Sequence, residues 1–130
     1  MNISVAGIAG KSGKIFVARR KMGGDMGGKW EFPGGKVEEG ENEEACIVRE
    51  FFEEFNVGIR CGKFLGESSF EHKGIKRVLK AYSVYFLSFD LTLNEHDEWR
   101  WVDISEIKTL DFTPSDLMLL PFIGSKTGEE

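Results

Sequence analysis

The feature that most constrains the fold is one strongly amphipathic segment, which predicts a helix ending near Phe55. Asn42 is suited to cap its N-terminus, and Glu43 and Glu44 place negative charge in the first turn, where the helix dipole favours it. Asn56 follows at the point where a residue in the left-handed conformation commonly ends a helix. Both ends of this helix are therefore marked in the sequence.

The two faces of the predicted helix differ in chemistry. At about 100° per residue, apolar side chains share one arc of roughly 120°, and carboxylates fall on the opposite arc. The apolar set is Ala45, Val48, Phe51, Phe52 and Phe55, and the acidic set is Glu43, Glu50, Glu53 and Glu54. We expect the helix to bury its aromatic stripe and to present its carboxylate stripe.

The clustered carboxylates of Glu50, Glu53 and Glu54 repel one another unless a cation joins them. Oxygen ligands select hard divalent ions, so the pattern predicts Mg²⁺, with Mn²⁺ as an alternative. A solvated acidic face is the competing interpretation, because Glu is a good helix former. The preceding bend, Pro33-Gly34-Gly35, favours the interpretation as a metal site, because backbone without side chains can approach a ligand or the metal.

The rest of the chain predicts strands around this helix. We expect a hairpin of two strands, further strands after the helix, one helical turn and a short C-terminal helix. The segments are Ile3–Ala9, Ile15–Arg20, Lys29–Phe32, Val57–Leu65, Glu67–Glu71, Val78–Phe89 and Trp99–Val102 for strands, then Asp103–Lys108 and Ser115–Phe122 for helices, with a frayed tail after Phe122. This order predicts one α/β domain over residues 1–130, layered as a sandwich with a mixed sheet.

Composition excludes several classes of protein. The 130 residues carry 22 acidic and 17 basic side chains, a net charge of −5, which argues against a binder of nucleic-acid polymers. No apolar run approaches the roughly 18 residues of a membrane span. Cys46 and Cys61 lack metal-site spacing, so we expect reduced thiols and a cytoplasmic location. An acidic protein that handles phosphates would need metal ions or well-placed basic groups.

The segment from Gly35 to Val57 resembles the Nudix box, G-x5-E-x7-R-E-U-x-E-E-x-G-U, where U is a bulky aliphatic residue. The matching positions are Gly35, Glu41, Arg49, Glu50, Glu53, Glu54 and Val57, with the aromatic Phe51 at the first bulky position. Asn56 stands where the pattern has Gly, and Asn tolerates the same backbone conformation. The surrounding WEFPGGKVE, Arg19-Arg20 and the Trp99–Val102 strand are similar to MutT-like members of this family.

The resemblance implies an α/β/α sandwich with one catalytic helix and a second helix at the C-terminus. It implies that Glu50, Glu53, Glu54 and the Gly34 carbonyl hold the metal, that Arg49 orients these glutamates, and that Glu41 is structural. Glu50 and Glu95 are alternative general bases. His96, beside Glu95, is expected to be an exposed polar residue and not a ligand.

Substrate contacts are predicted from weaker features. Arg20 and Lys36 are candidate phosphate contacts, and Phe70 and Phe112 are candidate rings for stacking on a base. The segment Phe112–Leu120 resembles one in MutT-like enzymes and bacterial CTP pyrophosphohydrolases, where Asp116 would read the edge of the base. A carboxylate would accept from cytosine, whereas a protonated Asp would suit oxidised guanine; a plain charge at a helix N-terminus is the alternative.

The predicted activity is Mg²⁺-dependent hydrolysis of a (deoxy)nucleoside triphosphate to the monophosphate and pyrophosphate. The small-molecule nucleotide is the expected partner, with no nucleic-acid polymer or membrane, and the chain is expected to be a monomer or homodimer. ADP-ribose or a dinucleoside polyphosphate is the alternative substrate. A non-catalytic nucleotide-binding module and an acidic interaction domain without a ligand are the alternatives to an enzyme.

Overall fold

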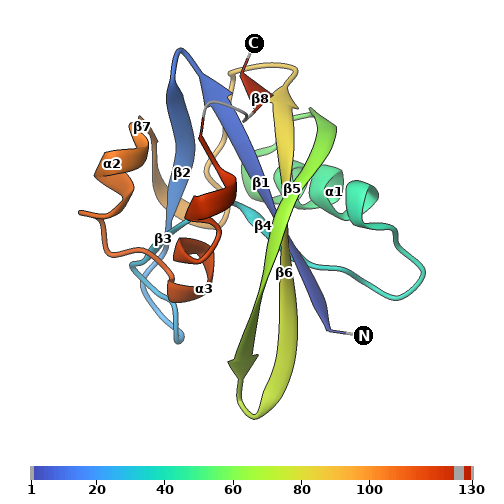
Figure 1. Ribbon diagram of the computed structural model, residues 1–130. Coiled ribbons are helices and arrows are strands. Elements are labelled where there is room, and N and C mark those ends of the chain that lie inside the picture. Colours follow the sequence, from blue (N-terminus) through green and yellow to red (C-terminus); the bar gives the residue numbers. More distant parts are fainter. Residues whose placement is uncertain (1, 125–127, 130) are drawn as a thin grey trace.

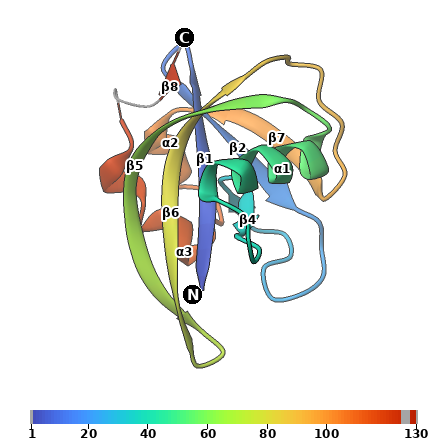
Figure 2. The same cartoon turned by 90° about the vertical axis from the view of Figure 1, so that its right-hand side faces the viewer.

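The computed structural model describes residues 2–124 and 128–129. A mixed sheet lies between helices on its two faces, as Figures 1 and 2 show. The elements follow the order β1 (Ile3–Lys11), β2 (Lys14–Arg20), β3 (Trp30–Glu31), β4 (Gly34–Lys36), α1 (Glu43–Phe55), β5 (Ile59–His72), β6 (Ile75–Phe86), β7 (His96–Val102), α2 (Ile104–Ile107), α3 (Pro114–Leu117), the 3₁₀ helix η1 (Leu120–Phe122) and β8 (Gly128–Glu129). The predicted α/β sandwich is confirmed.

The sheet is built around β1, which is buried on both faces. Its strand order is β3-β2-β1-β6-β5; β1 pairs in parallel with β6 and antiparallel with β2 and β4, and β7 pairs with β2. Alternate residues of β1 therefore face different helices. Val5 and Ala9 pack with α1, whereas Ala6 and Ile8 pack with the C-terminal segment.

Both predicted hairpin strands form, and they meet at a two-residue turn. Ser12 and Gly13 have φ values of 53° and 79°, which are typical of the turn that matches strand twist. A second such turn at Lys73-Gly74, which the sequence analysis did not identify, joins β5 to β6. The long β5–β6 hairpin projects beyond the rest of the sheet (Figure 1).

Two sequence-based assignments of elements are corrected. The predicted strands Val57–Leu65 and Glu67–Glu71 form one strand, β5, because Gly66 stays within it. A Cβ at Gly66 would lie 2.3 Å from the Phe122 ring, so this glycine serves packing and does not break the strand. The predicted helix Ser115–Phe122 is divided into α3 and η1, because Pro121 has no N–H to continue an α-helix.

The chain after Phe122 was expected to be frayed. Gly128–Glu129 instead pairs with β1 at Ala9 and Gly10. The prediction for residues 125–127 and 130 lies outside the described residues. Among the described residues, no helix has the length and apolar character needed to cross a membrane.

Helix α1 has the predicted ends but a different buried face. Asn42 caps it by accepting from the Ala45 N–H at 2.7 Å, and Asn56 is left-handed, with φ 54°. The predicted buried stripe is wrong in part, because Val48 and Phe52 are 39% and 59% exposed.

The buried side chains of α1 are Cys46, Ile47, Phe51, Glu54 and Phe55, and Ala45 is also exposed. Relative to the expected face, the helix is rotated by roughly a third of a turn. The rotation places Glu54 against the sheet, a position that apolar periodicity alone does not predict for a carboxylate.

Candidate active site

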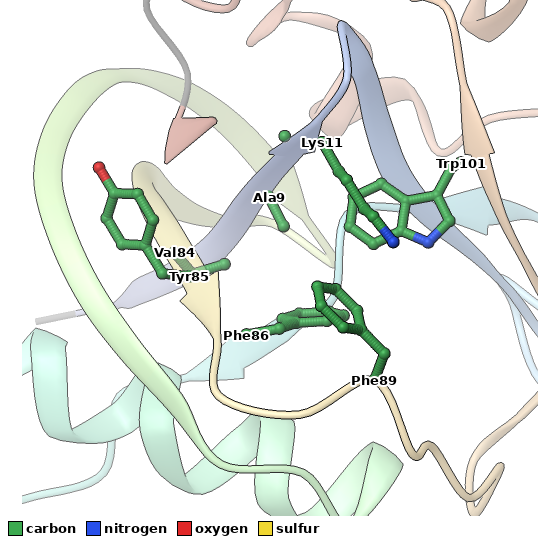
Figure 3. A pocket seen from close by; sticks show the side chains of 8 residues that line it. Ala9, Lys11, Val84, Tyr85, Phe86, Phe89 and Trp101 are labelled. Atoms are coloured by element: carbon green, nitrogen blue, oxygen red, sulfur yellow. The ribbon is translucent and has the colours of Figure 1, made fainter. Parts of the chain in front are cut away.

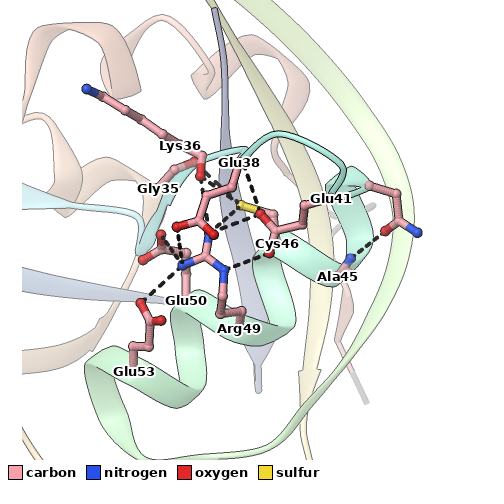
Figure 4. A network of polar contacts seen from close by, with 10 residues as sticks. Gly35, Lys36, Glu38, Glu41, Ala45, Cys46, Arg49, Glu50 and Glu53 are labelled. Atoms are coloured by element: carbon pink, nitrogen blue, oxygen red, sulfur yellow. Dashed lines mark hydrogen bonds and ion pairs between the residues drawn. The ribbon is translucent and has the colours of Figure 1, made fainter.

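Arg49 organises the carboxylates between β4 and α1 (Figure 4). Its guanidinium donates to both oxygens of Glu41, at 2.6 and 3.0 Å, to Glu50 at 3.2 Å and to Glu53 at 3.1 Å. It also donates to the Lys36 carbonyl at 3.2 Å, which ties the helix to β4. One guanidinium therefore holds Glu41, Glu50 and Glu53 together; that Arg49 orients metal ligands stays a prediction.

Glu41 closes the loop before α1, as the sequence predicted for a structural residue. Besides receiving the Arg49 fork, its carboxylate accepts from the Glu38 N–H at 3.0 Å. The hydrogen bond from Arg49, followed by that from Glu38, lowers the pKa of Glu41 to about 2. Glu41 is therefore ionised at neutral pH and committed to Arg49.

Glu50 and Glu54 lie deeper than Glu53. Burial is the main cause that raises the pKa of Glu50, and the charges of Glu53 and Glu95 add to it. Burial, a hydrogen bond with Glu50 and the charge of Glu31 raise the pKa of Glu54. The buried Oε1 of Glu54 has no hydrogen-bond partner among the described residues. A divalent cation fits this donor set, because it would neutralise the repulsion that otherwise holds a proton there.

Gly34 and Gly35 allow β4 to lie close to the carboxylates and to β1. A Cβ at Gly35 would fall 2.3 Å from Glu50 Oε2, and one at Gly34 would fall 1.9 Å from the Val5 carbonyl oxygen. The predicted bend thus continues into a short strand, and its glycines allow the backbone of this strand to lie close to Glu50 and to β1. The predicted metal ligands Gly34, Glu50, Glu53 and Glu54 therefore come from two adjacent elements, β4 and α1.

Glu95, the second candidate base, is exposed in the segment just before β7. Its charge acts on both Glu50 and Glu54, so the loop brings its carboxylate toward the same cluster. Glu50 and Glu95 therefore stay the two predicted general bases.

The prediction that His96 is exposed is wrong. His96 is only 1% exposed, and its ring stacks on Phe55 with centroids 5.0 Å apart. Its Nε2 lies 2.8 Å from Oε2 of Glu31, a residue that the sequence analysis did not select. The sequence did contain a signal that could have identified Glu31. It lies between the aromatic residues Trp30 and Phe32, and alternate residues of a strand point to opposite faces, so Glu31 faces away from these two rings.

A pocket of about 170 Å³ adjoins the carboxylate cluster and shares Gly34 and Gly35 with it. Its polar walls include Arg20, Glu31 and Asp116, and Phe70 contributes an aromatic ring. Arg20 lies 3.3 Å from Glu31 and keeps half of its side chain in solvent. The pocket therefore joins three of the predicted substrate residues: Arg20, Phe70 and Asp116.

Asp116 is a buried residue in the wall of this pocket. Its Oδ2 accepts the Phe32 N–H at 2.8 Å. Burial, followed by the charge of Glu31, raises its pKa to about 7. Asp116 can therefore serve as a hydrogen-bond donor or acceptor near neutral pH, whereas a plain exposed charge at a helix N-terminus does not describe its environment.

Two predicted substrate contacts lie elsewhere. Phe112 is 4% exposed and packs edge-on against Phe32, with centroids 5.0 Å apart, so it is a core residue with little free surface for a base. Lys36 contacts Arg49 through its backbone, and its side chain points away from the carboxylates (Figure 4).

A different pocket of about 270 Å³ has mainly aromatic walls, formed by Phe86, Phe89 and Trp101 with Lys11 beside them (Figure 3). Lys11 Nζ lies 4.2 Å from the Phe89 ring centroid. None of the catalytic or metal-binding candidates lines this pocket, so we place the candidate active site at the carboxylate cluster.

Comparison with known proteins identifies relatives over nearly the whole chain. The family model of the NUDIX domain matches residues 1–121. The protein named CTP pyrophosphohydrolase of Escherichia coli (strain K12) is 34% identical over 116 residues, covering 89% of this chain and 86% of the relative. The putative 8-oxo-dGTP diphosphatase 2 of Mycobacterium tuberculosis (strain H37Rv) is 32% identical over 121 residues, covering 88% and 82%.

Solved structures agree with this relationship. The solution structure of the E. coli ORF135 protein has a TM-score of 0.83 and 34% identity, covering 93% of this chain and 86% of that one. The MutT protein of Methanosarcina mazei Go1 has a TM-score of 0.80 and 27% identity, covering 93% and 88%. The motif between Gly35 and Val57, the layered fold and these matches agree: the chain belongs to the Nudix hydrolase family.

Proposed function

We propose that this protein hydrolyses a nucleoside triphosphate to the monophosphate and pyrophosphate with the help of Mg²⁺. One observation carries the proposal: the Glu50–Glu53–Glu54 cluster, in which Arg49 binds Glu50 and Glu53, lies beside a pocket whose wall includes Asp116. Bound Mg²⁺ supplies charge neutralisation for the phosphates and lowers the pKa of an attacking water. Mn²⁺ is the alternative ion.

The chain's own residues divide the work between the two halves of this site. Glu50, Glu53, Glu54 and the Gly34 carbonyl hold the cation, and Arg49 fixes the positions of Glu50 and Glu53. Glu50 or Glu95 accepts the proton of the attacking water. Arg20 contacts a phosphate when it exchanges its surface ion pair with Glu31 for the substrate.

The base is read by Asp116, with Phe70 as the ring beside it. The relatives named CTP pyrophosphohydrolase and 8-oxo-dGTP diphosphatase support two substrate classes, cytosine nucleotides and oxidised guanine nucleotides. An ionised Asp116 accepts from the exocyclic amine of cytosine, and a protonated Asp116 donates to a guanine edge. We place the enzyme in the cytoplasm, as a monomer or a homodimer.

A nucleotide panel tests the activity. We expect pyrophosphate and monophosphate to be released in equal amounts from CTP, 5-substituted dCTP or 8-oxo-dGTP in the presence of Mg²⁺, and we expect chelation by EDTA to stop the reaction. The products are separated by anion-exchange chromatography. Rapid turnover of ADP-ribose or a dinucleoside polyphosphate without any triphosphate hydrolysis would contradict the proposal.

The raised pKa of Asp116 predicts opposite pH dependences for the two base classes. Because Asp116 ionises near pH 7, kcat/KM for a cytosine nucleotide should rise relative to that for 8-oxo-dGTP as the pH increases from 6 to 8. The measured quantity is the ratio of the two kcat/KM values, in which groups common to both reactions, such as the metal ligands, cancel.

Asp116→Asn is the matched variant for this measurement. Its amide retains an acceptor for the Phe32 N–H but does not titrate, so the ratio should become independent of pH. A wild-type ratio that stays constant between pH 6 and 8 would remove Asp116 from base recognition while leaving the hydrolytic activity unaffected.

A further inference from the structure

Glu54 also belongs to a second group of side chains whose types can bind a metal ion. Glu31, Glu54 and His96 each bring one ligand atom to within 4.8 Å of the others. They come from β3, α1 and β7, and both strands pair with β2: Glu31 lies opposite Ala18 and His96 lies opposite Arg20. The sheet therefore holds two of the three ligands, and α1 brings the third.

This group differs from an ordinary acidic surface patch. Glu54 is 3% exposed and His96 1% exposed, and Oε1 of Glu54 and Nδ1 of His96 are buried without hydrogen-bond partners among the described residues. A buried carboxylate oxygen without a partner is costly, and a bound cation would remove that cost. The parallel ring of Phe55 also fixes the plane of the imidazole.

We propose that Glu31, Glu54 and His96 form an inner cation site that prefers a first-row transition-metal ion, with Mn²⁺ as its probe, over Mg²⁺. Two carboxylates and a neutral imidazole carry a charge of −2, which balances one divalent ion. Mg²⁺ favours oxygen ligands and retains its waters, whereas an imidazole nitrogen suits transition metals. A site this deep, with a nitrogen ligand, therefore discriminates against Mg²⁺.

The groups around the site are compatible with a cation. The charges of Glu50 and Glu95 act on Glu54 and add to the negative potential. Arg20 is the positive group beside Glu31, at 3.3 Å, and it lies at the surface, where it can turn into solvent. The 2.8 Å contact between His96 Nε2 and Glu31 would be replaced by shared coordination of the ion. Glu31 and His96 lie outside the Gly35–Val57 motif, whereas Glu54 belongs to it, so the inner site would share Glu54 with the predicted catalytic metal ligands and add two ligands of its own.

Stoichiometry of metal binding tests the inner site without requiring turnover. We expect the wild-type protein to bind two equivalents of Mn²⁺, measured by electron paramagnetic resonance of the free ion, and His96→Gln to bind one, or to lose at least about tenfold in affinity for one equivalent. Isothermal titration with Mg²⁺ should give the same curve for both proteins. His72→Gln, which changes the only other histidine of the chain, is the control.

A second measurement identifies the ligand directly. Zn²⁺ is a diamagnetic probe for the same site, and we expect its first equivalents to shift the ¹⁵N imidazole resonances of His96 and not those of His72. Glu31→Gln, which keeps a group able to hydrogen-bond His96, should abolish that shift and provides a second variant if His96→Gln does not fold.

Equal Mn²⁺ binding by wild type, His96→Gln and Glu31→Gln, with unshifted His96 resonances, would overturn the proposal and leave a hydrogen-bonded structural pair. Because these readouts need no substrate, failure of the inner site is distinguishable from failure of the proposed hydrolysis. Turnover of the wild-type protein with Mg²⁺ is measured independently of these titrations, and the absence of turnover on every nucleotide would leave Mn²⁺ binding in place.

Discussion

Replacing Glu53 with glutamine is expected to lower kcat by about 10³-fold with Mg²⁺ while leaving the fold intact. Glu53 is the most accessible member of the carboxylate cluster, with 48% of its side chain exposed, and among the described residues its ion pair is with Arg49. Glutamine preserves the size of the side chain but removes the charge that a divalent cation needs. The loss should therefore appear in turnover and metal affinity, and only weakly in thermal stability.

Glu44→Gln is the matched control for this experiment. Glu44 is an exposed glutamate in the first turn of the same helix, away from the Arg49 network, so the change should leave kcat within twofold of wild type. Pyrophosphate release and the thermal unfolding midpoint are measured for all three proteins. Equal and negligible hydrolysis by wild type and Glu53→Gln would favour a non-catalytic nucleotide-binding module.

Arg49→Lys is expected to lower both stability and activity, although it preserves the charge. The guanidinium fork satisfies Glu41, Glu50, Glu53 and the Lys36 carbonyl together, and an ammonium group cannot adopt this planar geometry. We expect a loss of about 1–3 kcal/mol in the free energy of unfolding, because hydrogen bonds between charged groups are broken. We expect kcat to fall about 10- to 100-fold, as for other residues that orient metal ligands.

The Arg100→Lys variant separates this effect from a general intolerance of lysine. The side chain of Arg100 is 46% exposed; it pairs with Glu98 on the same strand and lies over the Trp30 ring, 4.7 Å from the ring centroid. Lysine keeps the charge for both contacts, so we expect less than about 1 kcal/mol of change. Denaturant unfolding and steady-state kinetics provide the two readouts. If Arg49→Lys retained wild-type stability and turnover, the network in Figure 4 would have no organising role.

The sequence was sufficient for features that depend on neighbouring residues. Both ends of α1 formed as predicted, because the capping of Asn42 and the left-handed conformation of Asn56 are local properties. The hairpin from β1 to β2 also formed, because alternating apolar residues flank a turn. The motif spacing placed Arg49 one turn before Glu53, so their contact follows from helix geometry.

The sequence was less informative where packing decides the orientation of an element. Val48 and Phe52 have the chemistry of buried residues, but α1 turns them outward and turns Glu54 inward. The apolar stripe underestimated the contribution of Cys46 and Ile47, which pack against β1 and its neighbours. Packing also decides the position of Phe112, which was a candidate for stacking on a base. It lies in the core because the C-terminal segment closes over Phe32 and Trp30.

The sequence by itself determined the ends of α1 and its clustered carboxylates, because these depend on spacing within about four turns of chain. Only the tertiary structure decided that Glu31 and His96, 65 residues apart, meet beside Glu54. Their contact depends on the pairing of β3 and β7 with the same strand, β2, and on the rotation of α1 above them. Such a contact is set by long-range strand register and packing, which a local pattern of residue types does not encode.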